Sequence, residues 1–285
     1  MYPYVTYILT CQRKNMYAFL EILMKSLLHS GLPEVVEDGK TFCFISETST
    51  RIHSDVALLC SRYHFVHAIH GVRPRTLFQN FIDCLSDGVK KADWIFILQD
   101  DTYIARNCFL YMDWVIRNIP QSTGILSFFT HYTDTRSWPY LFWPYPAILL
   151  DGAQALLFNR FCADEFLQSR ARREHESLPK NKGDYITELF PHKQIDYCLR
   201  RYLIRESNYR LFGHNPCLVQ HTGGNTSSVD NVGDRLSPNF IGRDSCCMYM
   251  LNEYMDRWEN FVNHTNTFQS EKQRSRNSFM EWAFV

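Results

Sequence analysis

The stretch KADWIFILQDDTYI, from Lys91 to Ile104, runs an almost wholly apolar segment into two adjacent carboxylates, Asp100 and Asp101. The apolar part has the length and the aromatic and β-branched residues of a buried strand. Two carboxylates this close repel each other, and the repulsion grows as their surroundings lose water. Either the strand ends in solvent here, or a cation lies between the two carboxylates.

Strand and helix patterns alternate along the chain on both sides of this stretch. In the first half, strands are predicted at 4–10, 41–47 and 64–69, and helices at 16–27 and 77–85. This alternation predicts an α/β fold with a parallel or mostly parallel central sheet flanked by helices. In such sheets ligands bind at the carboxyl ends of the strands. Asp100 and Asp101 fall at such an end.

The second half is less regular, but it ends one strand on a histidine. Strands are predicted at 124–129, 153–159 and 215–221, and helices from 161 and at 194–204. The last strand ends at His221, and a loop rich in Gly, Ser and Asn follows to Arg243. A strand-end histidine beside a flexible loop is an available metal ligand. Apolar residues at helical spacing from Met248 to Val262 predict an amphipathic C-terminal helix.

Net charge, cysteine spacing and the N-terminal segment indicate which kinds of partner and compartment to expect. Lysine plus arginine equals aspartate plus glutamate, which argues against non-specific nucleic-acid binding by bulk charge. None of the ten cysteines forms a CxxC pair, so a zinc site or a disulfide framework is not expected, and a reducing compartment fits best. The N-terminal apolar run is too short for a membrane span and lacks a basic flank. We expect a cytoplasmic protein, in the host cytoplasm if it is viral, without stable membrane insertion.

The acidic pair and the strand-end histidine suit a site for phosphates. Hard divalent cations bind carboxylate oxygens and bridge to phosphate oxygens. An acidic turn at a solvated strand end is the alternative.

The order of the motifs resembles a known family. The motifs are TxxR at 10–13, QDD at 99–101, DGAQALLFN at 151–159, QIDYCLRR at 194–201 and LVQHTGGNTSS at 218–228. Together they look like a GT-A-fold, nucleotide-sugar-dependent glycosyltransferase. The last motif is similar to one in the N-glycan-branching β-1,4-N-acetylglucosaminyltransferases and their bacterial and viral relatives. The resemblance implies a Rossmann-like GT-A domain over 1–243, with a nucleotide-binding half (1–123) and an acceptor and catalytic half (124–243). A C-terminal helical extension would occupy 244–285.

By this resemblance Asp101 and His221 bind Mn²⁺ or Mg²⁺, and Asp100 faces the donor sugar. The imidazole favours Mn²⁺, because nitrogen donors suit later ions better. Gln99 stands where the family often has an acid, so the metal affinity is expected to be lower. Asp196, at the start of a helix, matches the catalytic base; Asp184 and Glu188 are its nearest rivals.

The remaining predicted site residues bind the donor or the acceptor. Arginines pair with phosphate through a bidentate fork, and a glycine lets the backbone approach the sugar closely. Aromatic side chains stack on an acceptor sugar or base, although an aromatic loop of this kind can equally bury itself. The donor candidates are Thr10, Arg13, Arg73, Arg75, Asn80, Gln99, Asp100, Gly152 and Arg243, and the acceptor candidates are Trp138, Tyr140, Trp143 and Tyr145.

The implied reaction moves a sugar from a nucleoside-diphosphate sugar, with a UDP-sugar favoured, to an acceptor hydroxyl with inversion. The acceptor is a glycan or a hydroxylated base in phage or viral DNA, and the arginines at 170–173 and 200–201 are candidate phosphate contacts. Two alternatives remain. One is a Mg²⁺-dependent nucleotidyltransferase or phosphohydrolase, which needs further carboxylates at the metal. The other is a non-catalytic nucleotide-binding module, which Gln99 favours.

Overall fold

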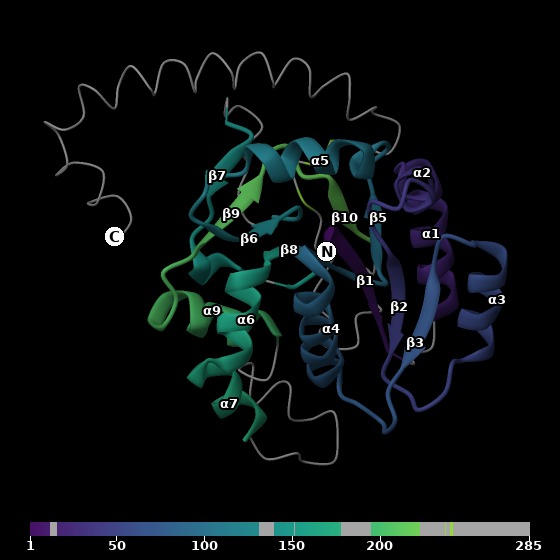
Figure 1. Cartoon of the computed structure of the whole chain (residues 1–285), viewed down its shortest axis with the longest axis horizontal. Helices are drawn as coiled ribbons and strands as arrows, with labels where there is room; N and C mark the ends of the chain where they lie inside the picture. The colour runs from purple at the N-terminus through teal and green to yellow at the C-terminus, as the bar shows by residue number, and fades with distance from the viewer. Residues whose placement is uncertain are drawn as a thin grey trace, which may run out of the picture.

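A computed structural model describes residues 1–11, 16–130, 140–150, 152–177, 195–222, 237 and 240–241. Its centre is an eight-stranded sheet in the order β3-β2-β1-β4-β8-β6-β9-β7 (Figure 1). These strands are β1 (Tyr2–Thr10), β2 (Cys43–Glu47), β3 (His67–His70), β4 (Ala92–Gln99), β6 (Thr123–Ser127), β7 (Phe142–Pro144), β8 (Ala155–Asn159) and β9 (Arg210–His214). Two further strands, β5 (Thr102–Ile104) and β10 (Val219–His221), form a small antiparallel sheet.

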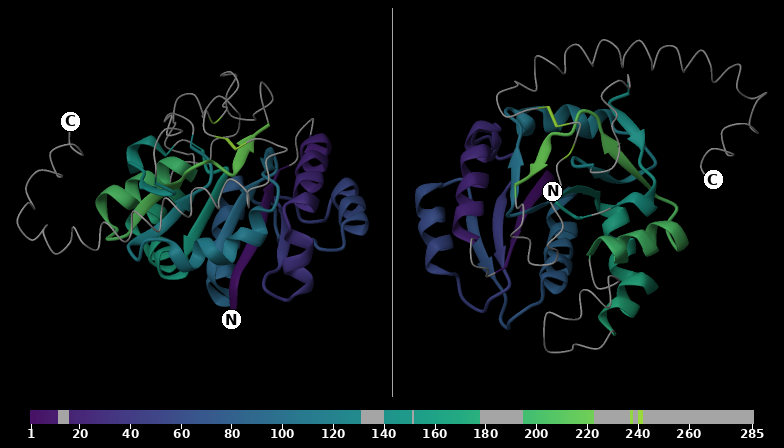
Figure 2. Two further views of the ribbon diagram at one scale, coloured as in Figure 1. Left: turned by 90° about the horizontal axis from the view of Figure 1, so that it is seen from above. Right: turned by 180° about the vertical axis from the view of Figure 1, so that it is seen from behind.

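The predicted α/β fold with a mostly parallel sheet is confirmed. Strands β3, β2, β1 and β4 are parallel neighbours, and so are β6 and β9. Strand β8 lies between β4 and β6 and is antiparallel to both, while β7 is antiparallel to β9 at one edge. The N-terminus and the carboxyl ends of the parallel strands lie at opposite ends of the sheet (Figure 2, left).

Helices cover both faces of the sheet, so its central strands are buried on both sides. They are α1 (Met16–His29), α2 (Leu32–Glu37), α3 (Ser54–Arg62), α4 (Leu77–Lys91), α5 (Cys108–Asn118), α6 (Arg160–Gln168), α7 (Arg170–Glu176) and α9 (Ile195–Arg205). Helices α1, α2, α3 and α5 pack on one face with Tyr4 and Ile8 of β1. Helices α4, α6, α7 and α9 pack on the other with Val5 and Tyr7. This alternation along β1 is the two-residue period of a strand, and burial on both faces explains its continuous apolar sequence.

Helix α4 is capped at its first turn, and a buried amide fixes it to the sheet. Thr76 caps its first turn by accepting a hydrogen bond from the backbone N–H of Gln79 at 3.1 Å. Asn80 is fully buried, and its amide both accepts from the Ser46 hydroxyl (2.7 Å) and donates to the Ser46 carbonyl (2.8 Å). Asn80 therefore ties α4 to the carboxyl end of β2.

Several expected segments lie outside the described residues. They are the loop from 223 to 236 and the predicted C-terminal helix, with the division after residue 243. Within the described part of the chain, no helix is long and apolar enough to cross a membrane. The eight cysteines in this part are all free.

His214, at the end of β9, is a buried imidazole that the fold keeps neutral. Its ring stacks on Phe128 with centroids 5.5 Å apart, and Nδ1 lies 2.7 Å from the carbonyl oxygen of Pro216. Burial lowers the pKa of His214 to about 4. The folded state therefore binds its proton less readily than the unfolded chain, whose histidine titrates near an ordinary value of about 6.5.

We predict that His214 makes folding stability fall as the pH drops from about 6.5 to about 4, because the unfolded state takes up a proton that the folded state refuses. A shift of this size corresponds to about 3 kcal/mol. Urea unfolding from pH 7 to pH 4 should show a pH dependence smaller by about that amount in His214→Phe than in wild type. His67→Gln, at an exposed position in β3, serves as the control. Equal pH dependence in wild type and His214→Phe would contradict this assignment.

Candidate active site

The two carboxylates after β4 do not end the strand in solvent. Asp100 and Asp101 are each only 4% exposed. Thr10, the last residue of β1, donates its hydroxyl to Oδ2 of Asp100 at 2.6 Å, and the Asp100 N–H donates to the Leu9 carbonyl at 3.1 Å. Two neighbouring carboxylates are thus held in a dry environment, where their repulsion is strongest.

The small sheet brings His221 to Asp101. Strand β10 pairs with β5 so that His221 lies opposite Thr102, the residue after Asp101. Nε2 of His221 lies 3.4 Å from Oδ2 of Asp101, and the N–H of Thr222 donates to the Asp101 carbonyl at 2.8 Å. His221 is also buried. Its Nδ1 has no hydrogen-bond partner among the described residues, although buried polar atoms are normally paired.

Asp101 and His221 fit a shared divalent cation. Two ligand atoms each about 2.1 Å from one ion lie about 3.0–3.4 Å apart at angles of roughly 90–110°, which matches the observed separation. Within the described residues, no group of three or more His, Cys, Asp or Glu side chains is arranged to hold a metal. A cation on this pair therefore needs further ligands, and phosphate oxygens are suitable ones.

Asp196, in the first turn of α9, is a buried carboxylate that accepts hydrogen bonds from a backbone N–H and from a guanidinium. The N–H of Gly152 donates to its Oδ2 at 3.1 Å, and Nη2 of Arg200 lies 3.2 Å from the same atom. Arg200 also donates through Nε to the carbonyl of Leu150. These contacts fix the carboxylate of Asp196 against Gly152 and Leu150, which precede β8.

Gly152 is required where it stands. Its φ is +82°, in the left-handed region that side chains other than glycine seldom adopt. A Cβ at this position would lie 2.2 Å from Oε1 of Gln154. The carbonyl of Gln154 in turn accepts a hydrogen bond from the N–H of Gln99 at 2.9 Å. Gly152 and Gln154 thus join the end of β4 to Asp196.

The structure therefore brings together Thr10, Gln99, Asp100, Asp101, Gly152, Asp196 and His221 along one edge of the sheet. Arg75 and Asn80 have internal partners instead. The largely buried Arg75 side chain pairs with Asp83 at 3.1 Å and donates to the carbonyl of Glu47. The Asn80 amide is hydrogen-bonded to Ser46 through both its oxygen and its nitrogen. The structure therefore favours a bracing role for Arg75 and Asn80 over direct phosphate contact.

The aromatic loop divides between the core and the surface. Trp143 and Tyr145 are buried in the core with ring centroids 4.9 Å apart, and Tyr145 donates its hydroxyl to the Leu149 carbonyl at 2.7 Å. Their burial supports the interpretation of a loop that packs on itself, and speaks against acceptor stacking by these two rings. Tyr140 is partly exposed. Five predicted residues lie outside the described residues: Arg13, Trp138, Asp184, Glu188 and Arg243.

Glu47 is a strand-end carboxylate that our sequence reasoning missed. It ends β2 directly opposite Thr10 and is buried, and it accepts a hydrogen bond from the His53 N–H at 2.7 Å. Burial raises its pKa, and the His53 N–H acts in the opposite direction. The signal was available, because the rule that singled out Asp100 at a strand end applies equally to Glu47.

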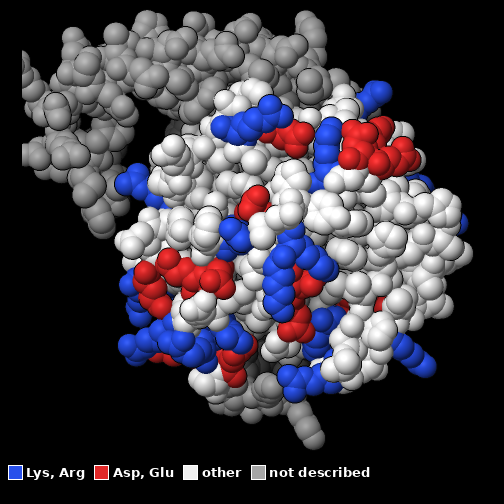
Figure 3. Space-filling model, viewed as in Figure 1, with Lys and Arg blue, Asp and Glu red and all other residues white. Residues whose placement is uncertain are grey.

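Three of the arginines that were candidate DNA contacts pair with glutamates. Arg170 Nε lies 2.5 Å from Glu174, Arg172 lies 2.8 Å from Glu176, and Arg201 also contacts Glu174. Figure 3 shows blue and red side chains interleaved over this part of the surface rather than a uniform basic patch. These pairs remove much of the support that the two clusters gave to a DNA acceptor.

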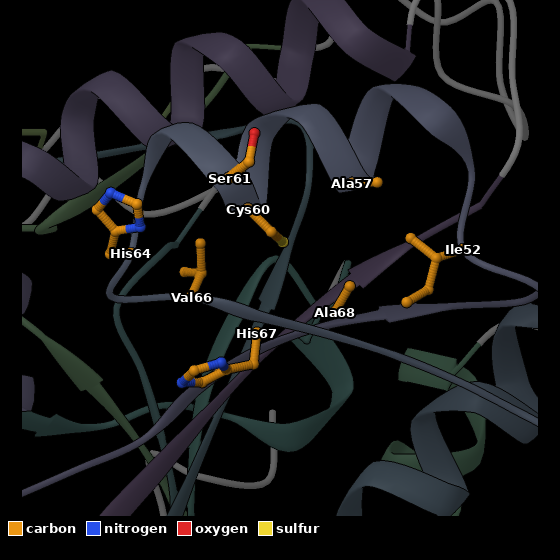
Figure 4. A pocket seen from close by; sticks show the side chains of 8 residues that line it. All are labelled: Ile52, Ala57, Cys60, Ser61, His64, Val66, His67 and Ala68. Atoms are coloured by element: carbon orange, nitrogen blue, oxygen red, sulfur yellow. The ribbon is translucent and has the colours of Figure 1, made fainter.

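A separate cavity of about 430 Å³ lies between α3 and β3. Residues from both elements and from the turn between them line it, including Cys60, His64, Val66 and His67 (Figure 4). Burial raises the pKa of Cys60 to about 11, so its thiol stays protonated at neutral pH. None of the lining residues belongs to the group at the carboxyl edge.

No protein-family model and no curated protein matches this chain. Solved structures with a similar arrangement include a mannosyltransferase from Pyrobaculum calidifontis in complex with GDP-Man and Mn²⁺, with 12% identity, a TM-score of 0.45 and coverage of 73% of this chain and 53% of that chain. S. aureus TarS 1–349 has 10% identity, a TM-score of 0.45 and coverage of 75% and 58%. The galactosyltransferase LgtC, in complex with donor and acceptor sugar analogs, has 11% identity, a TM-score of 0.44 and coverage of 89% and 94%.

This chain therefore aligns with only slightly more than half the length of the first two structures. At these identities and TM-scores, the likeness carries no argument about function.

We predict that Gly152→Ala destabilises the protein more than Gly39→Ala does. Both glycines have positive φ, but a Cβ at Gly39 meets nothing within 4 Å, whereas one at Gly152 collides with Gln154. Gly39→Ala should cost about 1–2 kcal/mol from backbone strain alone. Gly152→Ala should cost at least about 1 kcal/mol more. Urea unfolding measures both, and equal losses would show that Gln154 does not pack against Gly152.

Proposed function

We propose that this protein is a GT-A-type glycosyltransferase that moves a sugar from a nucleoside-diphosphate sugar, with a UDP-sugar as first candidate, to an acceptor hydroxyl. The proposal rests on one observation above all: Asp101 and His221 form a buried pair 3.4 Å apart at a strand-end edge. Asp196 is held on the same edge through Gly152 and Gln154. A pair of metal ligands for the diphosphate and a base for the acceptor are the two components this reaction needs.

Asp101 and His221 would hold Mn²⁺ or Mg²⁺, with the mixed oxygen and nitrogen donors favouring Mn²⁺. A bound ion supplies charge neutralisation for the departing diphosphate without proton transfer. The Thr10 hydroxyl fixes Asp100 beside this pair, so that one carboxylate binds metal while its neighbour orients the donor.

Asp196 would accept the proton of the acceptor hydroxyl as that oxygen attacks the anomeric carbon. The Gly152 N–H and Arg200 both bind Oδ2, and they hold the carboxylate in one orientation. A single displacement of this kind inverts the anomeric configuration. A positioned general base typically contributes about 10²–10⁴ in rate.

We favour this reaction over nucleotidyl transfer or phosphate hydrolysis because the carboxylate of Asp101 is paired with an imidazole, whereas those reactions call for further carboxylates on the metal. The acceptor is a glycan or a hydroxylated DNA base. The pairing of Arg170, Arg172 and Arg201 with glutamates favours the glycan.

We predict that wild type with Mn²⁺ releases UDP, and no sugar 1-phosphate, from a UDP-sugar in the presence of an acceptor. Asp196→Asn should lower kcat by about 10²–10⁴, because the amide keeps the shape but cannot take the proton. Chromatography of the nucleotides and sugar phosphates measures the products released and kcat, with oligosaccharides and hydroxymethylated duplex DNA as acceptors.

Asp164→Asn is the matched control, since this carboxylate is exposed on α6 and accepts a hydrogen bond from the side chain of Gln168 at 3.1 Å. Its kcat should equal that of wild type. Sugar 1-phosphate as product, or full activity in Asp196→Asn, would contradict the proposed function.

A further inference from the structure

Gln154 occupies the position between the metal-binding strand and the proposed base. It directly precedes β8, and its carbonyl accepts the N–H of Gln99, the last residue of β4. Ala155, the next residue, pairs with Leu98. The main chain of Gln154 is therefore fixed relative to Asp100 and Asp101.

The side chain of Gln154 points at Gly152. A Cβ built on Gly152 would lie 2.2 Å from Oε1 and 2.3 Å from Nε2, so the amide fills the space beside this glycine. The N–H of the same glycine binds Asp196. Gly152 thus has the Gln154 amide against its Cα and the Asp196 carboxylate on its N–H.

The Oε1 atom of Gln154 is buried without a hydrogen-bond partner among the described residues, in a side chain that is only 4% exposed. A buried amide oxygen without a donor is destabilising, and folds seldom retain one without a reason. Buried hydroxyls without a partner also occur at Thr6 and Thr123. The unpaired state alone therefore does not mark a site; the place of this amide against Gly152, whose N–H binds Asp196, does.

The missing partner must be a hydrogen-bond donor. Phosphate oxygens of a nucleotide are acceptors at neutral pH, and a divalent cation prefers carboxylates to an amide oxygen. A sugar hydroxyl donates, and an amide can also donate back to a neighbouring hydroxyl. Because the transferred sugar must lie between the diphosphate and the base, its hydroxyls are the donors expected at this position.

We propose that Gln154 is a specificity-determining residue that binds a hydroxyl of the donor sugar through Oε1. This assignment rests on the proposed function and adds to it, because it separates recognition of the sugar from recognition of the nucleotide. In the proposed function the diphosphate binds at the Asp101–His221 pair, so the affinity for the nucleotide does not depend on the Gln154 side chain.

The test compares UDP with UDP-sugars in wild type and Gln154→Leu. Calorimetric titration in Mn²⁺ would give Kd for UDP, UDP-glucose, UDP-galactose and UDP-N-acetylglucosamine. Gln154→Leu should weaken the tightest UDP-sugar about tenfold, the effect of losing one hydrogen bond, and leave the Kd for UDP unchanged. Unchanged UDP binding also shows that the variant is folded. Gln168→Leu, an exposed position on α6, should change neither Kd.

Monodeoxy analogues of the same UDP-sugar identify the hydroxyl. One analogue should bind wild type about tenfold more weakly and lose nothing further in Gln154→Leu. A merely structural glutamine would not produce this pairwise pattern. Equal UDP-sugar affinity in wild type and Gln154→Leu would overturn the assignment and leave the proposed function intact. Failure of wild type to bind UDP, GDP, TDP or any of their sugars in Mn²⁺ would overturn both.

Discussion

The burial of two neighbouring carboxylates at the end of β4 is the constraint on which the rest of the site depends. Each needs compensation in a dry environment, and the structure supplies it differently. Asp100 receives the hydroxyl of Thr10 from the adjacent strand, and Asp101 faces the imidazole of His221. The small β5–β10 sheet brings the imidazole of His221 to the acidic pair.

The antiparallel direction of β8 brings Gly152 and Gln154 to the site. Since β8 is antiparallel to β4, its first residue lies at the end of the sheet where β4 finishes. The segment before β8 consequently enters the site edge, where Gly152 reaches Asp196 and Gln154 reaches Gln99. A parallel strand in this place would have presented its other end. The mixed sheet is therefore what brings the candidate metal ligands and the candidate base to one edge.

The strand ends and their carboxylates could be predicted from sequence, because periodicity and strand termini are local features. The sequence predicts the places of Asp100 and Asp101 directly after β4 and of His221 at the end of β10. The direction of β8 and the pairing of β5 with β10 depend on contacts between distant segments, which no local pattern contains. The same holds for side chains whose partners are remote, such as Arg201 with Glu174 and Asn80 with Ser46. Trp143 looked available because its neighbours are prolines and aromatics, yet β7 turns its ring into the core.

The most direct test of this account is whether Asp101 and His221 share a metal ion. Pulsed electron paramagnetic resonance of Mn²⁺ bound with UDP would detect the nitrogen of a coordinated imidazole. A nitrogen coupling is expected in wild type and in His67→Gln, and it should disappear in His221→Gln; Asp101→Asn should bind Mn²⁺ more weakly. A coupling that persists in His221→Gln, or its absence from wild type, would contradict the shared metal site.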